Sequence, residues 1–296
     1  MAGTLMAIGG AEDKVRERVI LRAFVEAAGG PDANLVVMAT ASELAETGDR
    51  YAALFESMHA DTVAVLRVHN RADALDAGSG MLDLLEFASG LFITGGSQLR
   101  ISAALGGTAI ADMIRRRHAE GMVVAGTSAG AAILSEHMIS MGDSGATPRR
   151  RLVQMAKGLG LAPDLIVDQH FRQRDRLGRL TTALSYNPGP LGVGVDEDTA
   201  AVIEGDSLRV IGSGAVTVID ASGLRYTDSP EVRRGQPLAL LGLKLDFLTA
   251  GCRYDLRRRI GLPPDEVPRY QEEAELEYSL SPGTGERAGE RGNGIK

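Results

Sequence analysis

Short apolar runs alternate with amphipathic stretches through the first two thirds of this 296-residue chain. Strands that alternate with helices are joined by crossover connections, and such connections build a mostly parallel sheet. The run at 35–38 is apolar throughout, as expected for a strand that is covered on both faces. We therefore predict an α/β fold in which a mostly parallel, doubly wound sheet carries helices on both faces. The predicted strands are 4–8, 34–39, 62–68, 90–94 and 122–125, and the predicted helices are 15–28, 43–59 and 81–88.

The remainder of the chain continues this pattern and then changes. We predict strands at 165–167 and 191–195, with a basic helix at 172–185 between them. We assign residues 1–280 to a single domain and predict a disordered C-terminal tail at 281–296, which is rich in Gly, Glu and Arg. Three β-rich runs joined by short turns also predict a small antiparallel β extension. These runs are 200–203, 207–211 and 215–219.

The segment Gly126-Thr127-Ser128-Ala129-Gly130-Ala131 is the most informative motif of the chain. It lies between the predicted strand at 122–125 and a helix-like stretch at 131–137. A strand, Gly-x-Ser-x-Gly and a helix in this order form a nucleophile elbow, in which a sharp turn exposes the serine hydroxyl. The two glycines let the chain fold back without a Cβ collision. We therefore predict Ser128 as a nucleophile.

A serine nucleophile needs a neighbouring base, and histidine is the usual one near neutral pH. The chain contains five histidines. His170 is the favoured candidate because it follows a predicted strand, at the carboxyl end where ligand sites collect in such sheets. His69 also closes a strand and is a weaker candidate. His137 is predicted on the helix after the elbow, pointing away from it, while His59 and His118 lie among charged residues of amphipathic helices.

The third member of a triad is a carboxylate that orients the imidazole. Three acidic residues meet this requirement by position, namely Asp168, Glu197 and Asp143, and spacing alone leaves the choice open. Serine chemistry also needs donors for the oxyanion. The N–H of Ala129 is one candidate, and the second comes from the neighbouring turn at 95–97.

Composition excludes several other classes of protein. A net charge of −7 does not suggest binding to nucleic acid or to an anionic membrane. A single cysteine, Cys252, excludes a disulfide framework or a Cys-rich metal site. The chain lacks a run of about 18 apolar residues and a signal-peptide pattern, so we expect a soluble, cytoplasmic protein. Its glycine-rich sites lack the full dinucleotide fingerprint, and serine chemistry requires no metal and no organic cofactor.

Six stretches of the chain together resemble the cyanophycinases, serine peptidases of the same family as the aspartyl dipeptidases. They occur in the family's order and span most of residues 5–260. The serine motif and Asp168-Gln-His-Phe171 are the distinctive ones. The stretches are 8–14, 94–98, 126–131, 168–171, 176–179 and 194–199.

The resemblance implies a triad of Ser128 as nucleophile, His170 as base and Glu197 as orienting acid. The order Ser, His, Glu differs from the Ser, acid, His order of α/β-hydrolases, which argues against a lipase or esterase. The reaction would pass through an acyl-enzyme, with the amides of Gly96 and Ala129 as the oxyanion hole. The substrate-binding residues implied by the resemblance are Gln98, Asp168, Gln169, Arg174, Arg176 and Arg179.

The family's substrate is a polymer with an aspartate backbone and an arginine on each side-chain carboxyl, and its product is the β-aspartyl-arginine dipeptide. Arginine suits bidentate binding of the free α-carboxylate of a β-aspartyl unit, and in a helix residues 172, 176 and 179 would share a face. Two other interpretations stay open: an aspartyl dipeptidase that acts on short peptides, and a non-catalytic binding protein of the same fold. The resemblance also implies a homodimer.

Overall fold

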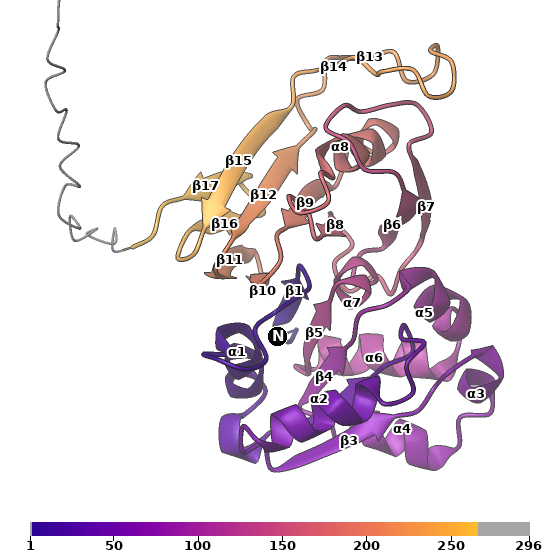
Figure 1. Cartoon of the computed structure of the whole chain (residues 1–296), viewed down its shortest axis with the longest axis vertical. Coiled ribbons are helices and arrows are strands. Elements are labelled where there is room, and N and C mark those ends of the chain that lie inside the picture. The colour runs from indigo at the N-terminus through magenta and orange to yellow at the C-terminus, as the bar shows by residue number, and fades with distance from the viewer. Residues whose placement is uncertain (1, 266–296) are drawn as a thin grey trace, which may run out of the picture. The chain divides into compact units, whose positions relative to one another are not determined.

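The structure is a computed structural model that describes residues 2–265, and these residues belong to one compact unit. Figure 1 shows the course of the chain through this unit. The domain boundary predicted at 280 and the tail predicted at 281–296 lie outside the described residues.

A nine-stranded sheet contains the five strands predicted for the first half of the chain. These are β1 (Leu5–Ile8), β2 (Asn34–Met38), β3 (Thr62–Leu66), β4 (Gly90–Ile93) and β5 (Val123–Thr127). They run parallel in the order β1-β5-β4-β2-β3. On the other side of β1 the sheet continues antiparallel with β10 (Thr199–Glu204), β11 (Ser207–Gly212), β16 (Arg253–Asp255) and β17 (Ile260–Leu262).

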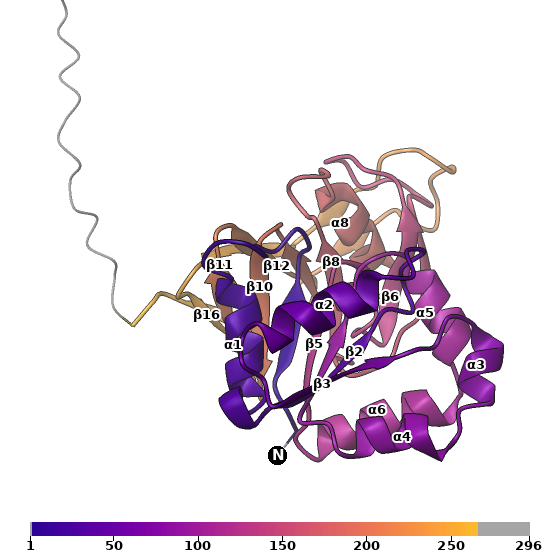
Figure 2. The same ribbon diagram turned by 60° about the horizontal axis from the view of Figure 1, so that its bottom comes forward.

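Helices cover both faces of the parallel strands (Figure 2). Successive side chains of a strand point to opposite faces. Met6 of β1 therefore belongs to the same apolar cluster as Phe24 and Phe55. Leu5 belongs to a second cluster that includes Ile114. The predicted doubly wound α/β arrangement is thus confirmed, with α1 (Val19–Ala27) and α2 (Thr47–Glu56) on one face, and α4 (Ser79–Glu86) and α6 (Ala109–Ala119) on the other.

A second, four-stranded sheet has the order β15-β12-β9-β8. Its strands are β8 (Leu165–Gln169), β9 (Leu191–Val195), β12 (Ala215–Asp220) and β15 (Lys244–Thr249). Strands β8 and β9 are parallel, whereas β12 is antiparallel to both of its neighbours. The predicted antiparallel extension is therefore divided between the two sheets. Its first two runs pair with each other in the large sheet, while the run at 215–219 pairs with β9 instead.

Three predicted helices begin later than their sequence pattern suggested: α1, α8 (Leu177–Tyr186) and α2, which begins four residues after the predicted start at 43. Before α1, the Asp13 carboxylate accepts the backbone N–H groups of Val15, Arg16 and Arg18, so this stretch forms a loop rather than a helical turn. Helix α8 begins five residues after the predicted start at 172. Residue Asp175 has a φ of 47°, outside the helical range. Arg172 and Arg179 consequently do not share a helix face.

The helix after the elbow is much shorter than predicted. Helix α7 (Ala129–Ala132) has four residues, and the chain then forms the antiparallel strands β6 (His137–Gly142) and β7 (Val153–Lys157). His137 therefore lies in a strand and not on the elbow helix.

No helix within residues 2–265 has the length and apolarity needed to cross a membrane. The smaller elements are η1 (Gly30–Asp32), α3 (Arg71–Leu75), α5 (Gln98–Leu105), β13 (Tyr226–Thr227) and β14 (Leu240–Leu241).

Close packing of β9 against the segment after β8 leads to a stability prediction. A Cβ at Gly194 would lie 2.5 Å from Cγ of the buried Phe171 ring, so Gly194→Ala should lower the free energy of unfolding by about 1–3 kcal/mol. The control Gly80→Ala adds a methyl group in α4, where nothing outside the adjoining backbone lies within 4 Å of it, and should cause no loss. Urea denaturation measures both, and equal midpoints for the two variants would contradict this packing.

Candidate active site

Ser128 lies at the sharp turn between β5 and α7. Its backbone has φ 54° and ψ −112°, an uncommon conformation for a residue with a side chain. The neighbouring glycines are required sterically: a Cβ at Gly126 would lie 2.0 Å from the carbonyl oxygen of Gly130, and a Cβ at Gly130 would lie 2.1 Å from that of Ile93. The Ser128 N–H donates to the carbonyl of Ile8 at the end of β1. The motif therefore has the backbone geometry of a nucleophile elbow.

His170 follows β8 in the second sheet, and its imidazole meets the serine of the first. Oγ of Ser128 and Nε2 of His170 are 2.9 Å apart. On the other side of the ring, Nδ1 lies 2.6 Å from Oε1 of Glu197, which follows β9. The ring packs on Gly10, where a Cβ would be only 2.3 Å from Cε1 of the imidazole. Three side chains from the two sheets thus form a continuous hydrogen-bonded chain.

The environment of His170 favours the neutral imidazole. Burial is the largest contribution and lowers the pKa of His170 below its ordinary value. The hydrogen bond to Glu197 raises this pKa, whereas the positive charges of Arg174 and Arg176 lower it. A neutral imidazole whose Nδ1–H donates to the carboxylate has a free lone pair at Nε2, toward Ser128. It can therefore accept the proton of the serine hydroxyl.

The two other carboxylates considered from the sequence have different surroundings. Asp168 is 1% exposed and binds the guanidinium of Arg179, with Nε 2.7 Å from Oδ2. Its Oδ1 also accepts the N–H of Gln169. Asp143 follows β6, and its backbone N–H donates to Leu152. Within residues 2–265, neither of these carboxylates contacts His170, so Glu197 alone of the three does so.

The arginines near His170 fall into two groups. Arg176 and Arg179 are buried, and Nη1 of Arg176 donates to Oε1 of Gln169 at 2.8 Å. Burial lowers the pKa of Arg176 to about 10, and its Nε has no partner among the described residues. Arg174 is exposed, and across residues 2–265 its side chain forms no ion pair. Its charge nevertheless acts on His170.

The two predicted oxyanion donors belong to different segments: Ala129 directly follows the serine, and Gly96 lies in the turn after β4. Ala129 is the first residue of α7, so its N–H has no acceptor within the helix. The turn after β4 approaches the serine closely, because a Cβ at Gly95 would lie 3.2 Å from Cβ of Ser128. Gly96 has a φ of 140°, and a Cβ there would lie 2.1 Å from the carbonyl oxygen of Ala41. Two residues after Gly96, Gln98 donates its amide hydrogens to two carbonyls of β6, at 2.9 and 3.1 Å.

A buried acidic residue supports the elbow and was missed from the sequence. Glu12 accepts a hydrogen bond of 2.6 Å from the hydroxyl of Thr127, the residue before the serine. It also accepts the hydroxyl of Tyr51 and lies 3.0 Å from Nζ of Lys14. The sequence signal that could have identified Glu12 is its position in the stretch 8–14, just after a strand. The remaining histidines lie elsewhere: His59, His69 and His137 are exposed, and His118 bonds to Met122.

No cluster of three or more His, Cys, Asp or Glu side chains within the described part of the chain could hold a metal ion. Ser128, His170 and Glu197 place a hydroxyl, an imidazole and a carboxylate in sequence at this site. This arrangement can carry out nucleophilic acyl transfer.

Comparison with known proteins gives the family. The chain is 46% identical over 262 residues to the cyanophycinase of Trichormus variabilis, covering 88% of this chain and 87% of that protein. It is 44% identical over 258 residues to the cyanophycinase of Geminocystis herdmanii, covering 86% and 94% respectively. Among solved structures, a peptidase from an acI-B1 Actinobacterium has a similar fold, with a TM-score of 0.62 and 21% identity over 86% of this chain and 97% of that one.

The family model described as peptidase family S51 matches residues 5–211, which include the elbow, His170 and Glu197. The match covers more than half of the chain and agrees with the curated relatives. The protein therefore belongs to peptidase family S51 and is a serine-type peptidase.

Proposed function

We propose that this protein is a cyanophycinase, a serine exopeptidase that hydrolyses multi-L-arginyl-poly-L-aspartate to β-aspartyl-arginine dipeptides. Two observations support the proposal together. The relatives at 44–46% identity over most of the chain carry this name. Ser128, His170 and Glu197 form the hydrogen-bonded chain that acyl transfer needs, and this second observation carries the mechanism.

The product determines which bond must break. Because β-aspartyl-arginine keeps the bond between the aspartate side chain and arginine, the bond that is hydrolysed is the main-chain peptide bond between successive aspartates. His170 accepts the proton of Ser128, and Oγ attacks the carbonyl carbon of that bond. The amides of Ala129 and Gly96 stabilise the oxyanion. The imidazolium, held by Glu197, then protonates the leaving amine, and water releases the acyl group in the reverse sequence.

The arginines near His170 supply two different functions in this proposal. Arg174 is exposed and unpaired across the described residues, so it is the group best suited to bind a substrate carboxylate. Arg176 and Arg179 are held by Gln169 and Asp168, so they shape the wall and the positive potential of the site. Gln98 contributes in the same way by fixing β6 beside α5. A cytoplasmic location and a homodimeric state belong to this proposal as well, and sedimentation analysis would test the latter.

The nature of the products tests the proposed function directly. Incubation of the purified protein with the insoluble polymer should clear the suspension and release β-aspartyl-arginine as the main product. Mass spectrometry identifies this dipeptide. Turnover of short aspartyl dipeptides with an intact polymer would instead assign the protein as a dipeptidase, and turnover of neither would favour a binding protein.

Replacement of the nucleophile should abolish activity without unfolding the protein. We expect Ser128→Ala to keep the wild-type melting temperature and to lose about 10⁴-fold or more in kcat, because no acyl-enzyme can form. A serine-directed phosphonate should label the wild type but not this variant. Ser57→Ala, at an exposed serine, serves as the matched control and should behave as wild type. Near-normal turnover by Ser128→Ala would remove this residue from the mechanism.

The pH dependence of kcat/KM should identify the orienting acid. Since burial lowers the pKa of His170, the neutral base persists below the ordinary histidine pKa, and activity should fall only on the acid side of that value. Glu197 raises this pKa, so Glu197→Gln should move the acid limb to still lower pH while reducing kcat by up to about 10⁴-fold. Asp143→Asn should change neither the position of the acid limb nor kcat. An acid limb that stays in place in Glu197→Gln would contradict the assignment.

A further inference from the structure

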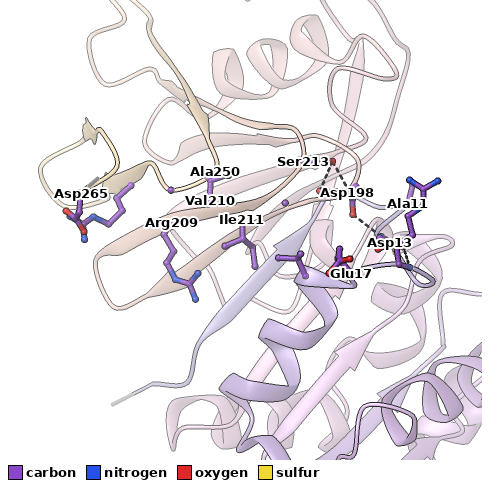
Figure 3. Close-up of a pocket in the computed structure, with 15 residues that line it drawn as sticks. Ala11, Asp13, Glu17, Asp198, Arg209, Val210, Ile211, Ser213, Ala250 and Asp265 are labelled. Carbon is purple, nitrogen blue, oxygen red and sulfur yellow. Dashed lines mark hydrogen bonds and ion pairs between the residues drawn. The ribbon is translucent and has the colours of Figure 1, made fainter. Parts of the chain in front are cut away.

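A large cavity lies beside the triad and has no part in the mechanism above. Its volume is about 860 Å³, within the range of ligand-binding pockets. One side is formed by the loop before α1 and the start of that helix, and the other by β11 with the loop after β15. Figure 3 shows Glu17 on the first side and Arg209 with Ile211 on the second.

Two chain segments connect this cavity to the active site. Ala11 lines the cavity and directly follows Gly10, on which the imidazole of His170 packs. Asp198 also lines it and directly follows Glu197. Adjacent Cα atoms are about 3.8 Å apart, so the rim of the cavity begins one residue from the catalytic groups. The cavity therefore adjoins the acid of the triad and the glycine on which its base packs.

Two acidic residues at this rim, Asp13 and Asp198, accept hydrogen bonds that hold the loop, so their carboxylates are not available to a ligand. Oδ1 of Asp198 accepts the N–H of Asp13, and its Oδ2 accepts the hydroxyl of Ser213. The Asp13 carboxylate in turn receives backbone N–H groups of Arg16, Arg18 and Val15, which lower the pKa of Asp13 to about 2. The rim is therefore a fixed, pre-formed framework.

Charges of both signs remain available along the cavity. The guanidinium groups of Arg16 and Arg209 and the carboxylate of Glu17 all line it, and within residues 2–265 none of them has a hydrogen-bond or ion-pair partner. Val19 is 52% exposed and supplies apolar surface from α1. Ile211 lies two residues from Arg209 on β11, so both side chains project from the same face of that strand.

These groups match the chemistry of the polymer. Each unit carries one free guanidinium and one free carboxylate from its arginine, joined by a chain of methylenes. Arg16 and Arg209 can bind carboxylates, Glu17 can bind a guanidinium, and the apolar surface of Val19 and Ile211 can cover the methylenes. We propose that this cavity is an accessory site for the polymer chain beyond the scissile unit, an inference that rests on the proposed function.

Two substrates of different length test this site. The first is the intact polymer, and the second is a two-unit fragment whose only main-chain peptide bond between aspartates is the scissile one. Arg16→Glu/Arg209→Glu reverses both free positive charges, and Arg225→Glu is a charge-reversal control at an exposed arginine outside the cavity. A second control that reverses the charges of Arg225 and Arg234, both exposed, matches the change in net charge.

We expect the double variant to lose about 5- to 20-fold in kcat/KM on the polymer, mainly through KM, because two exposed ion pairs with the substrate are lost and the reversed charges also repel its carboxylates. Its kcat/KM on the two-unit fragment should stay within about twofold of wild type. The controls should match wild type on both substrates.

Three results would overturn the inference in distinguishable ways. Unchanged polymer kinetics in the double variant would exclude the cavity as an accessory site. An equal loss on both substrates would show that the substitutions disturb the triad rather than polymer binding. A wild-type protein that cleaves no polymer would refute the proposed function itself, and the accessory site with it.

Discussion

Three consecutive carbonyls at the end of β1 hold the two halves of the active site together. Ile8 accepts the N–H of Ser128 at 2.9 Å, Gly9 accepts that of His170 at 2.8 Å, and Gly10 accepts that of Asp198 at 2.9 Å. The nucleophile belongs to the first sheet, whereas the base and the acid follow strands of the second. Their relative positions therefore depend on the 8–10 segment, which bonds to both. The third bond fixes the residue next to Glu197 and so sets that carboxylate beside the imidazole.

The site is rigid because its backbone is constrained as well as its side chains. Ser128, His170 and Asp198 all have positive φ angles, between 47° and 54°. Residues in such conformations cost of order 1–3 kcal/mol each and persist only where the surrounding structure enforces them. Here these conformations are enforced by the carbonyls of residues 8–10, by the close glycine contacts of the elbow and by the buried Glu12, which accepts a hydrogen bond from Thr127. Such preorganisation aligns the hydroxyl with the imidazole before substrate binds.

Much of this architecture could be predicted from local sequence signals. The apolar runs marked the parallel strands, and Gly-x-Ser-x-Gly after a strand marked the elbow, because both depend on short-range sterics and on side-chain periodicity. Helix lengths were less predictable. The Asp13 carboxylate delays α1, and the four-residue α7 gives way to β6, since hydrogen bonds to side chains and strand pairing outweigh helix propensity there.

The sequence by itself determined the strand order along the chain, the turn that exposes Ser128 and the placement of His170 after a strand. Spacing could not choose among Asp143, Asp168 and Glu197, because the distance from a carboxylate to the imidazole depends on how two separate sheets meet. Only the tertiary structure decided that Asp168 is held by Arg179 while Glu197 bonds to His170. The same holds for the arginines: Arg176 and Arg179 are buried where they bond to Gln169 and Asp168 of β8, whereas Arg174 is exposed, and no local pattern distinguishes them.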